Sequence, residues 1–110
     1  MKLPNRTQAY VPERKLTAYL LSLSHPVGGS KARFFRKVGF DESTVEHLRE
    51  ELRRLAQRSE IDEVEETPHG TKYVITGSLY SPEGVAVTVR TVWMIERESN
   101  APRFVTAYPA

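Results

Sequence analysis

The chain has no cysteine, and this absence excludes several kinds of site. Without a thiol there is no disulfide framework, no thiolate metal centre and no cysteine nucleophile among the 110 residues. The three histidines also lack the spacing of metal ligands. We therefore expect a protein that works without a metal or another cofactor.

Long apolar runs are missing as well. The N-terminal MKLPNRTQAYVPERK has no apolar stretch of the kind that a secretory signal contains. No run approaches the ~18 apolar residues of a membrane span. We expect a cytoplasmic protein without membrane contact. Its length, with 39% apolar and 27% charged residues, predicts a single folded domain over 1–110.

Charge is unevenly distributed along the chain. Residues 1–40 hold eight lysines and arginines against one acid (+7), residues 41–70 hold four against ten (−6), and residues 71–110 hold four against three (+1). The basic third favours a polyanion such as RNA, and the acidic third favours a partner-facing or solvated surface. The alternative is that both charged surfaces only interact with water.

Hydrophobic periodicity changes near residue 60. Before it, apolar residues recur at helical spacing and predict helices over 12–22, 31–38 and 44–58, with a turn at 27–29 and a capping box at 43–46. After it, alternation predicts strands over 71–79, 85–96 and 103–108, with a short acidic strand candidate near 61–64 and a hairpin turn at 81–84. This order predicts an α+β fold, in which about three N-terminal helices pack on one face of a roughly four-stranded antiparallel sheet.

The alternation also assigns the two faces of the predicted sheet. Trp93, Tyr73, Val87 and Val89 are expected to meet the helices. The opposite face then carries Lys72, Thr76, Thr88 and Arg90. Such a polar, cationic face suits phosphate binding, and it equally suits an ordinary solvated face of an antiparallel sheet.

The segment HPVGGSKARFFRKVGF (25–40) is the most informative part of the chain. His25 is the best acid–base candidate, because histidine titrates near neutral pH; the alternative is a turn histidine that hydrogen-bonds the backbone. Lys31 opens the second predicted helix, where an anion is favoured. The other cations of this predicted helix lie away from its apolar stripe and are predicted to bind polyanions: Arg33, Arg36 and Lys37.

Two adjacent residues in the predicted strand 85–96 are the last candidate site residues that the sequence pattern alone indicates. Arg90 can grip a phosphate with its forked guanidinium, or it can form a cross-strand pair with an acidic neighbour. Thr91 interrupts an apolar face, so it either satisfies a buried polar group or marks the end of the sheet near a site.

Several strings in the chain resemble an uncharacterised bacterial family that is known only as a domain of unknown function. They are KLTAYLLSLSHPVGGSKARFFRKVGF (15–40), GTKYVITGSL (70–79), PEG (82–84), VRTVWMIE (89–96) and PRFVTAYP (102–109). Members are short proteins that often occur beside another small gene. The resemblance therefore implies a small cognate partner protein, comparable to an antitoxin.

The layout is also similar, more distantly, to the barnase–EndoU–colicin–RelE fold of metal-independent ribonucleases, many of them bacterial toxins. This resemblance implies a site that combines His25 and Lys31 of HPVGGSK, Arg90 and Thr91 of VRTVW, and Thr106 and Tyr108 of TAYP. Arg90 and Thr91 are adjacent in a strand, so they point to opposite faces unless a bulge intervenes. Thr106 and Tyr108 share a face.

Our leading hypothesis is RNA cleavage through attack of the 2′-hydroxyl on the adjacent phosphorus. The proposed catalytic residues are His25, Lys31, Arg90 and Tyr108. The proposed substrate-binding residues are Arg33, Arg36, Lys37, Lys72, Thr91 and Thr106. The alternatives are a non-catalytic module that binds the neighbouring gene product, through 60–66 or the basic second helix, and RNA binding without cleavage.

Overall fold

A computed structural model describes residues 1–25 and 29–110. Most of the predicted turn at 27–29 lies outside the described residues. The helical elements are η1 (Arg6–Gln8), α1 (Glu13–Lys15), η2 (Leu16–Leu20), α2 (Gly29–Lys37), η3 (Glu42–Thr44) and α3 (Val45–Arg58). The strands that follow are β1 (Ile61–Thr67), β2 (Gly70–Tyr80), β3 (Ala86–Glu96) and β4 (Arg103–Pro109).

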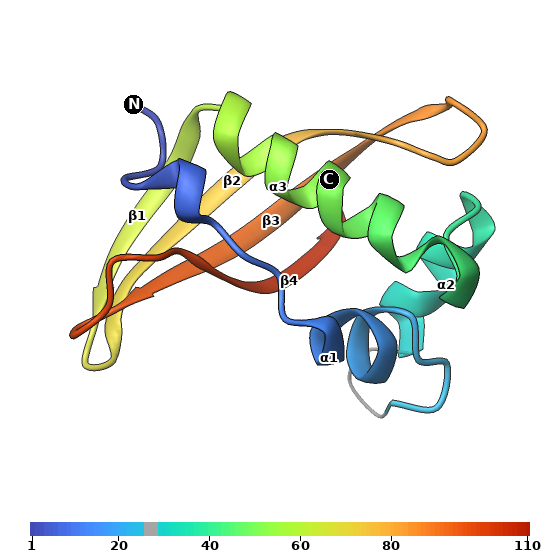
Figure 1. The fold of residues 1–110 in the computed structure, drawn as a ribbon, viewed down its shortest axis with the longest axis horizontal. Coiled ribbons are helices and arrows are strands. Elements are labelled where there is room, and N and C mark those ends of the chain that lie inside the picture. The colour runs from blue at the N-terminus through green and yellow to red at the C-terminus, as the bar shows by residue number, and fades with distance from the viewer. Residues whose placement is uncertain (26–28) are drawn as a thin grey trace.

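The four strands form one antiparallel sheet in the order β1-β2-β3-β4. Helices cover one of its faces, with α3 lying across the sheet (Figure 1). Trp93 is fully buried in the interface between the layers, opposite Tyr73 on β2. The predicted α+β fold, the strand pairing and the position of Trp93 are all confirmed.

Gly77 allows α3 to lie close to β2. A Cβ atom at this position would lie 2.6 Å from Ser59 Oγ and 2.9 Å from Leu55 Cγ, nearer than side-chain packing permits. The β2–β3 hairpin closes through 81–84, as the sequence predicts, and Gly84 takes a φ of 85° that glycine adopts without strain.

The first predicted helix, 12–22, is shorter and wider than its pattern suggests. One turn of α-helix at α1 passes into η2, a π-helical turn in which the Leu21 amide donates to the Leu16 carbonyl at 2.8 Å. Leu16, Leu20 and Leu21 are all buried. The wider turn therefore places three leucines in the core and directs Tyr19 along the edge of the sheet. π-Turns of this kind occur frequently at functional sites.

The predicted capping box begins at the wrong residue. The Asp41 carboxylate accepts from the Ser43 amide at 2.8 Å, and the Thr44 hydroxyl accepts from the Asp41 amide at 2.9 Å. Asp41 thus caps η3, the 3₁₀ turn that leads into α3, and no side chain caps α3 at Thr44. An aspartate is as good a cap as a serine or threonine, which explains the shift.

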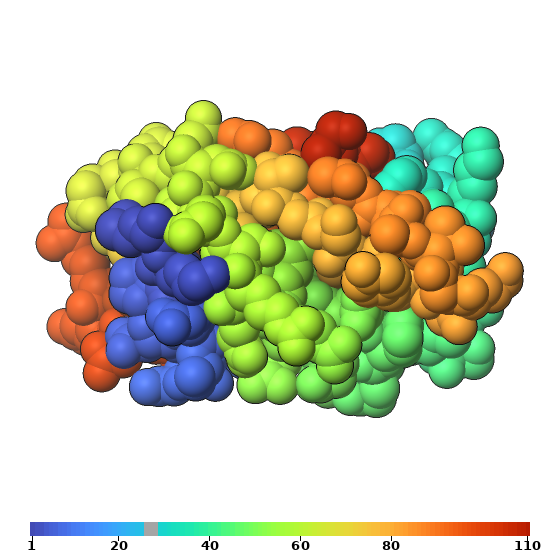
Figure 2. Space-filling model, turned by 90° about the horizontal axis from the view of Figure 1, so that it is seen from above, coloured from blue at the N-terminus to red at the C-terminus, as the bar shows by residue number. Residues whose placement is uncertain are grey.

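The N-terminal segment belongs to the core, although no hydrophobic periodicity in its residues predicts this. Leu3, Ala9 and Val11 are buried, and the Arg53 guanidinium of α3 donates to the Ala9 carbonyl at 2.9 Å. Figure 2 shows this blue segment packed alongside the green helix α3. The chain therefore uses its first residues to close one end of the apolar layer.

Thr91 provides a test of the core. Its hydroxyl accepts from the Trp93 indole N–H at 2.8 Å and donates to the Ile75 carbonyl at 2.8 Å, and its side chain is fully buried. Thr91→Val leaves the buried Trp93 indole N–H without an acceptor, so we expect the free energy of unfolding to fall by about 1–3 kcal/mol. Urea denaturation measures the change. Thr88→Val, on an exposed position of the same strand, is the control, and equal losses would contradict this role.

Candidate functional site

Tyr19 is the centre of a polar cluster that draws on three separate parts of the chain. Its hydroxyl lies 3.0 Å from the Thr106 hydroxyl on β4. The His25 ring meets the Tyr19 ring edge to face, with their centroids 5.0 Å apart. The Nζ of Lys31 in the first turn of α2 lies 5.5 Å from the Tyr19 centroid. His25, Lys31 and Thr106 are thereby brought around one side chain.

The local sequence explains why these residues meet. The buried leucines of η2 anchor that turn in the core, which leaves Tyr19 half-buried at its border. Helix α2 packs against both η2 and β4 and is anchored by Phe35 and Ala32, which are fully buried. Lys31, next to Ala32, therefore stays at the partly exposed margin where Tyr19 lies.

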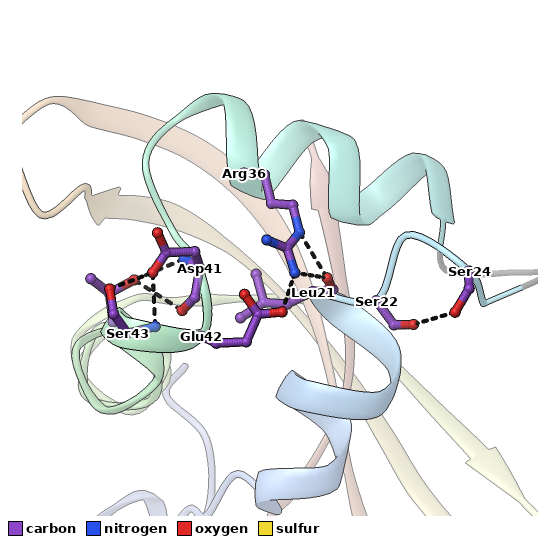
Figure 3. Close-up of polar contacts among 8 residues, drawn as sticks. Leu21, Ser22, Ser24, Arg36, Asp41, Glu42 and Ser43 are labelled. Carbon is purple, nitrogen blue, oxygen red and sulfur yellow. Dashed lines mark hydrogen bonds and ion pairs between the residues drawn. The ribbon is translucent and has the colours of Figure 1, made fainter.

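Arg36 holds this arrangement together. Its Nε and Nη2 donate to the Leu21 carbonyl at 2.9 and 2.7 Å, and Nη2 also pairs with Glu42, as Figure 3 shows. One guanidinium thus joins α2, the end of η2 and the start of η3. Because Nε and Nη2 are engaged within the fold, we assign Arg36 this bracing role in place of the predicted substrate binding.

A second group lies further along β4. Tyr108 is two residues from Thr106 and is the cross-strand partner of Arg90, whose guanidinium interacts with it. The same guanidinium lies 2.9 Å from Glu63 and 3.8 Å from Asp62, both on β1. Arg90 therefore reaches across β2 to an acidic pair. This arrangement is close to the cross-strand acidic pair that the sequence offered as the alternative to phosphate binding.

The remaining predicted residues divide into exposed, paired and buried groups. Arg33 and Lys37 are exposed on α2. Lys72 on β2 pairs with Glu65 at 2.9 Å, so β1 neutralises much of the cationic face expected from the sequence. Thr91 points into the core beside Trp93, and the bulge in the β3–β4 pairing lies beyond it, at Val92 and Trp93. We therefore leave Thr91 out of the candidate site.

The charges around Tyr19 change its acidity. Partial burial alone would raise the pKa of the Tyr19 hydroxyl, but the hydrogen bond with Thr106 and the ammonium groups of Lys31 and Lys15 outweigh it and lower the pKa below its usual value. Lys15 Nζ lies 5.1 Å from the centroid of the ring. The cluster thus favours negative charge at this point of the surface.

This electrostatic effect can be measured without any activity. Lys31→Met removes a cation that stabilises the phenolate, so the pKa of Tyr19 should rise. Titration of ¹³Cζ-labelled tyrosines by NMR follows it, with Tyr19→Phe identifying the signal among the five tyrosines. Lys37→Met, an exposed cation of the same helix, is the control. An unchanged Tyr19 titration in Lys31→Met would show that the two groups do not interact.

Tyr19 is the residue that sequence reasoning missed. It lies among leucines at apolar helical spacing, which gives no sign of a functional role. The signal that points to it is a nearby cation, because Lys15 precedes Tyr19 by four residues, about one helical turn. Nowhere in residues 1–25 and 29–110 do three histidine, aspartate or glutamate side chains gather in a way that could hold a metal ion.

Comparison with known families assigns the chain to one of them. The model of the family described as Domain of unknown function (DUF6883) matches residues 2–110. The chain therefore belongs to this family, as its motifs predicted. No curated protein matches the chain.

Among the described residues, none of the helices is both long and apolar enough to cross a membrane.

A solved structure shares the fold. It is a chain from the "Contact-dependent growth inhibition toxin - immunity protein complex from Klebsiella pneumoniae 342". The superposition has a TM-score of 0.71 and covers 94% of this chain and 95% of the other, at 15% sequence identity. At this identity the likeness establishes the common fold.

Proposed function

We propose that this protein is a toxin-type endoribonuclease that cleaves RNA without a metal. The observation that carries the proposal is the convergence of His25, Lys31 and the distant Thr106 on Tyr19. An imidazole and an ammonium group that both meet the Tyr19 ring provide a proton acceptor and a phosphate ligand together. The fold shared with a chain of a toxin–immunity protein complex supports a toxin-related role.

The chemistry is an internal transfer of the phosphoryl group. His25 removes the proton of the 2′-hydroxyl, and the freed oxygen forms a bond to the adjacent phosphorus. The bond from phosphorus to the 5′-oxygen breaks, and Tyr108 gives that oxygen a proton. The products are a 2′,3′-cyclic phosphate and a 5′-hydroxyl end, so no water or other reactant is consumed in this step.

The cations have different roles in this proposal. Lys31 stabilises the negative charge that builds up on the phosphoryl oxygens. Arg90 is a positioning residue, because Glu63 and Asp62 already hold its guanidinium beside Tyr108. Thr106 fixes Tyr19, against which His25 and Lys31 are placed. Arg33 and Lys37 remain exposed on α2 for backbone contacts with the RNA.

The experiment is cleavage of an end-labelled RNA pool by purified protein in excess EDTA. We expect fragments with 2′,3′-cyclic phosphate ends. RNA that stays intact would reject the enzyme and favour the second candidate, a module that binds a cognate protein.

That second candidate is supported by β1, an outer strand of the sheet whose acidic residues are exposed: Asp62, Glu63, Glu65 and Glu66. Binding to the product of the neighbouring gene tests it directly.

A further inference from the structure

A hollow of about 420 Å³ lies next to the proposed site. It is bounded by α1, η2, His25 and the first residue of β4. Its lining consists of Pro12, Arg14, Lys15, Ala18, Tyr19, His25 and Arg103. The volume falls within the range of roughly 300–1,000 Å³ that is typical of ligand sites in proteins.

The charge of this hollow is what distinguishes it. Its lining holds three cations and one histidine, and among the described residues it contains no carboxylate. Three other hollows of similar or smaller size each include at least one glutamate: Glu83, the pair Glu46 and Glu50, and Glu51. Cations gathered around a concave surface attract an anion.

Two acids close to these cations in sequence neutralise only part of this charge. Glu13, which precedes Arg14, lies 3.4 Å from Arg49 on α3. Glu96 is 2.9 Å from the Nε of Arg103 and so occupies that guanidinium in part. Arg14 and Lys15 are the two remaining cations, and Arg14 is exposed. An anion in the hollow would therefore meet these two side chains first.

The hollow and the proposed catalytic cluster share two residues. Tyr19 and His25 line the hollow, and both belong to the cluster that contains Lys31 and Thr106. Lys15 in the hollow and Lys31 outside its lining both lie within 5.5 Å of the centroid of the Tyr19 ring. A polyanion bound at His25 and Lys31 can thus continue directly into the hollow.

We propose that this hollow is a subsite for the RNA nucleotide next to the cleaved bond, with Arg14 and Lys15 binding that nucleotide's phosphate. The inference rests on the proposed ribonuclease function and adds to it a second point of contact with the substrate. Two such contacts fix the direction of the RNA strand through the site. They also make substrate length a determinant of affinity, since a mononucleotide fills only one of them.

Binding is tested with a fluorescein-labelled 2′-O-methyl RNA hexamer, which lacks the attacking hydroxyl. Fluorescence anisotropy gives its Kd over a series of salt concentrations. Arg14→Gln is expected to weaken binding about 3- to 10-fold at low salt and to reduce the slope of log Kd against log salt by about 0.7, because one phosphate contact is lost. Lys15→Gln is expected to act in the same direction.

Arg58→Gln is the matched control, because Arg58 is an exposed arginine at the end of α3, outside the hollow. In the cleavage assay, Arg14→Gln should raise KM and leave kcat unchanged. If RNA is cleaved but neither Arg14→Gln nor Lys15→Gln alters Kd or KM more than Arg58→Gln does, the subsite is wrong and the ribonuclease stands. If RNA is never cleaved and both variants still weaken binding, the ribonuclease is wrong and the hollow remains an RNA-binding site.

Discussion

His25→Ala should lower the rate of RNA cleavage by about 10²–10⁴-fold, the usual contribution of a placed acid–base group. The expectation follows from the contact between the His25 and Tyr19 rings, because Lys31 lies near the same tyrosine ring. The rate is measured on a single labelled RNA under single-turnover conditions, so that binding and product release do not enter. Circular dichroism and urea denaturation establish that the variant is folded.

His69→Ala is the control for this measurement. His69 is exposed in the turn between β1 and β2, away from the cluster, and its removal should leave the rate within about twofold of the original, as expected for a surface substitution. His47 is less suitable, because its Nε2 lies 2.9 Å from the Tyr80 carbonyl and its ring stacks on Phe40. A fully active His25→Ala protein would remove His25 from the mechanism.

Phe35→Ala should have the largest effect on stability, a loss of about 3–5 kcal/mol in the free energy of unfolding. Phe35 is fully buried, and its ring packs edge to face against Phe34 and Phe40, with centroids 5.1 and 6.3 Å apart. Truncation leaves a cavity beneath α2 that its neighbours cannot fill without moving the helix. Because α2 carries Lys31, RNA cleavage should also fall under conditions that populate the unfolded state.

Phe34→Ala is the matched control, since the two rings are consecutive in the chain. Phe34 is only half-buried and borders an open hollow near the β2–β3 turn. Its truncation removes less contact area, and the site can relax into solvent, so the loss of stability should be clearly smaller. Equal losses in the two variants would contradict the packing described for α2.

Much of the fold could be predicted because its signals are local. The stripe of Leu48, Leu52 and Leu55 predicted α3, and strict alternation on β3 predicted that Trp93 would face the helices. The 81–84 turn fixed the β2–β3 pairing, since a hairpin turn sets the register of its strands. Each of these inferences needs only residues that are close in sequence.

The features that were missed depend on distant contacts. The burial of Leu3 and Ala9 requires α3 and the sheet to be in place, and no pattern within the first ten residues reports it. The π-turn at η2 is stabilised by the burial of Leu16, Leu20 and Leu21, whose spacing also fits an ordinary α-helix. Helical periodicity over one or two turns cannot distinguish these two geometries.

The candidate site was predicted in outline only. The sequence named His25, Lys31 and Thr106, but it gave no reason for placing Tyr19 between them. It left Arg90 open between a phosphate ligand and a cross-strand pair, and it treated Arg36 as a free cation, whereas Glu63 on β1 and the Leu21 carbonyl engage these two arginines. Whether an arginine binds a ligand or braces the fold depends on which acceptors the tertiary structure brings to it.

The most direct test of the central claim is a comparison of two RNA oligonucleotides that differ by one oxygen. The first is an all-ribose strand with a mapped cleavage position, and the second carries a 2′-deoxy nucleotide on the 5′ side of that position. If His25 activates the 2′-hydroxyl, the first strand yields a 2′,3′-cyclic phosphate in EDTA, and the second is not cut at that bond. Cleavage of both strands at the same bond would contradict the account.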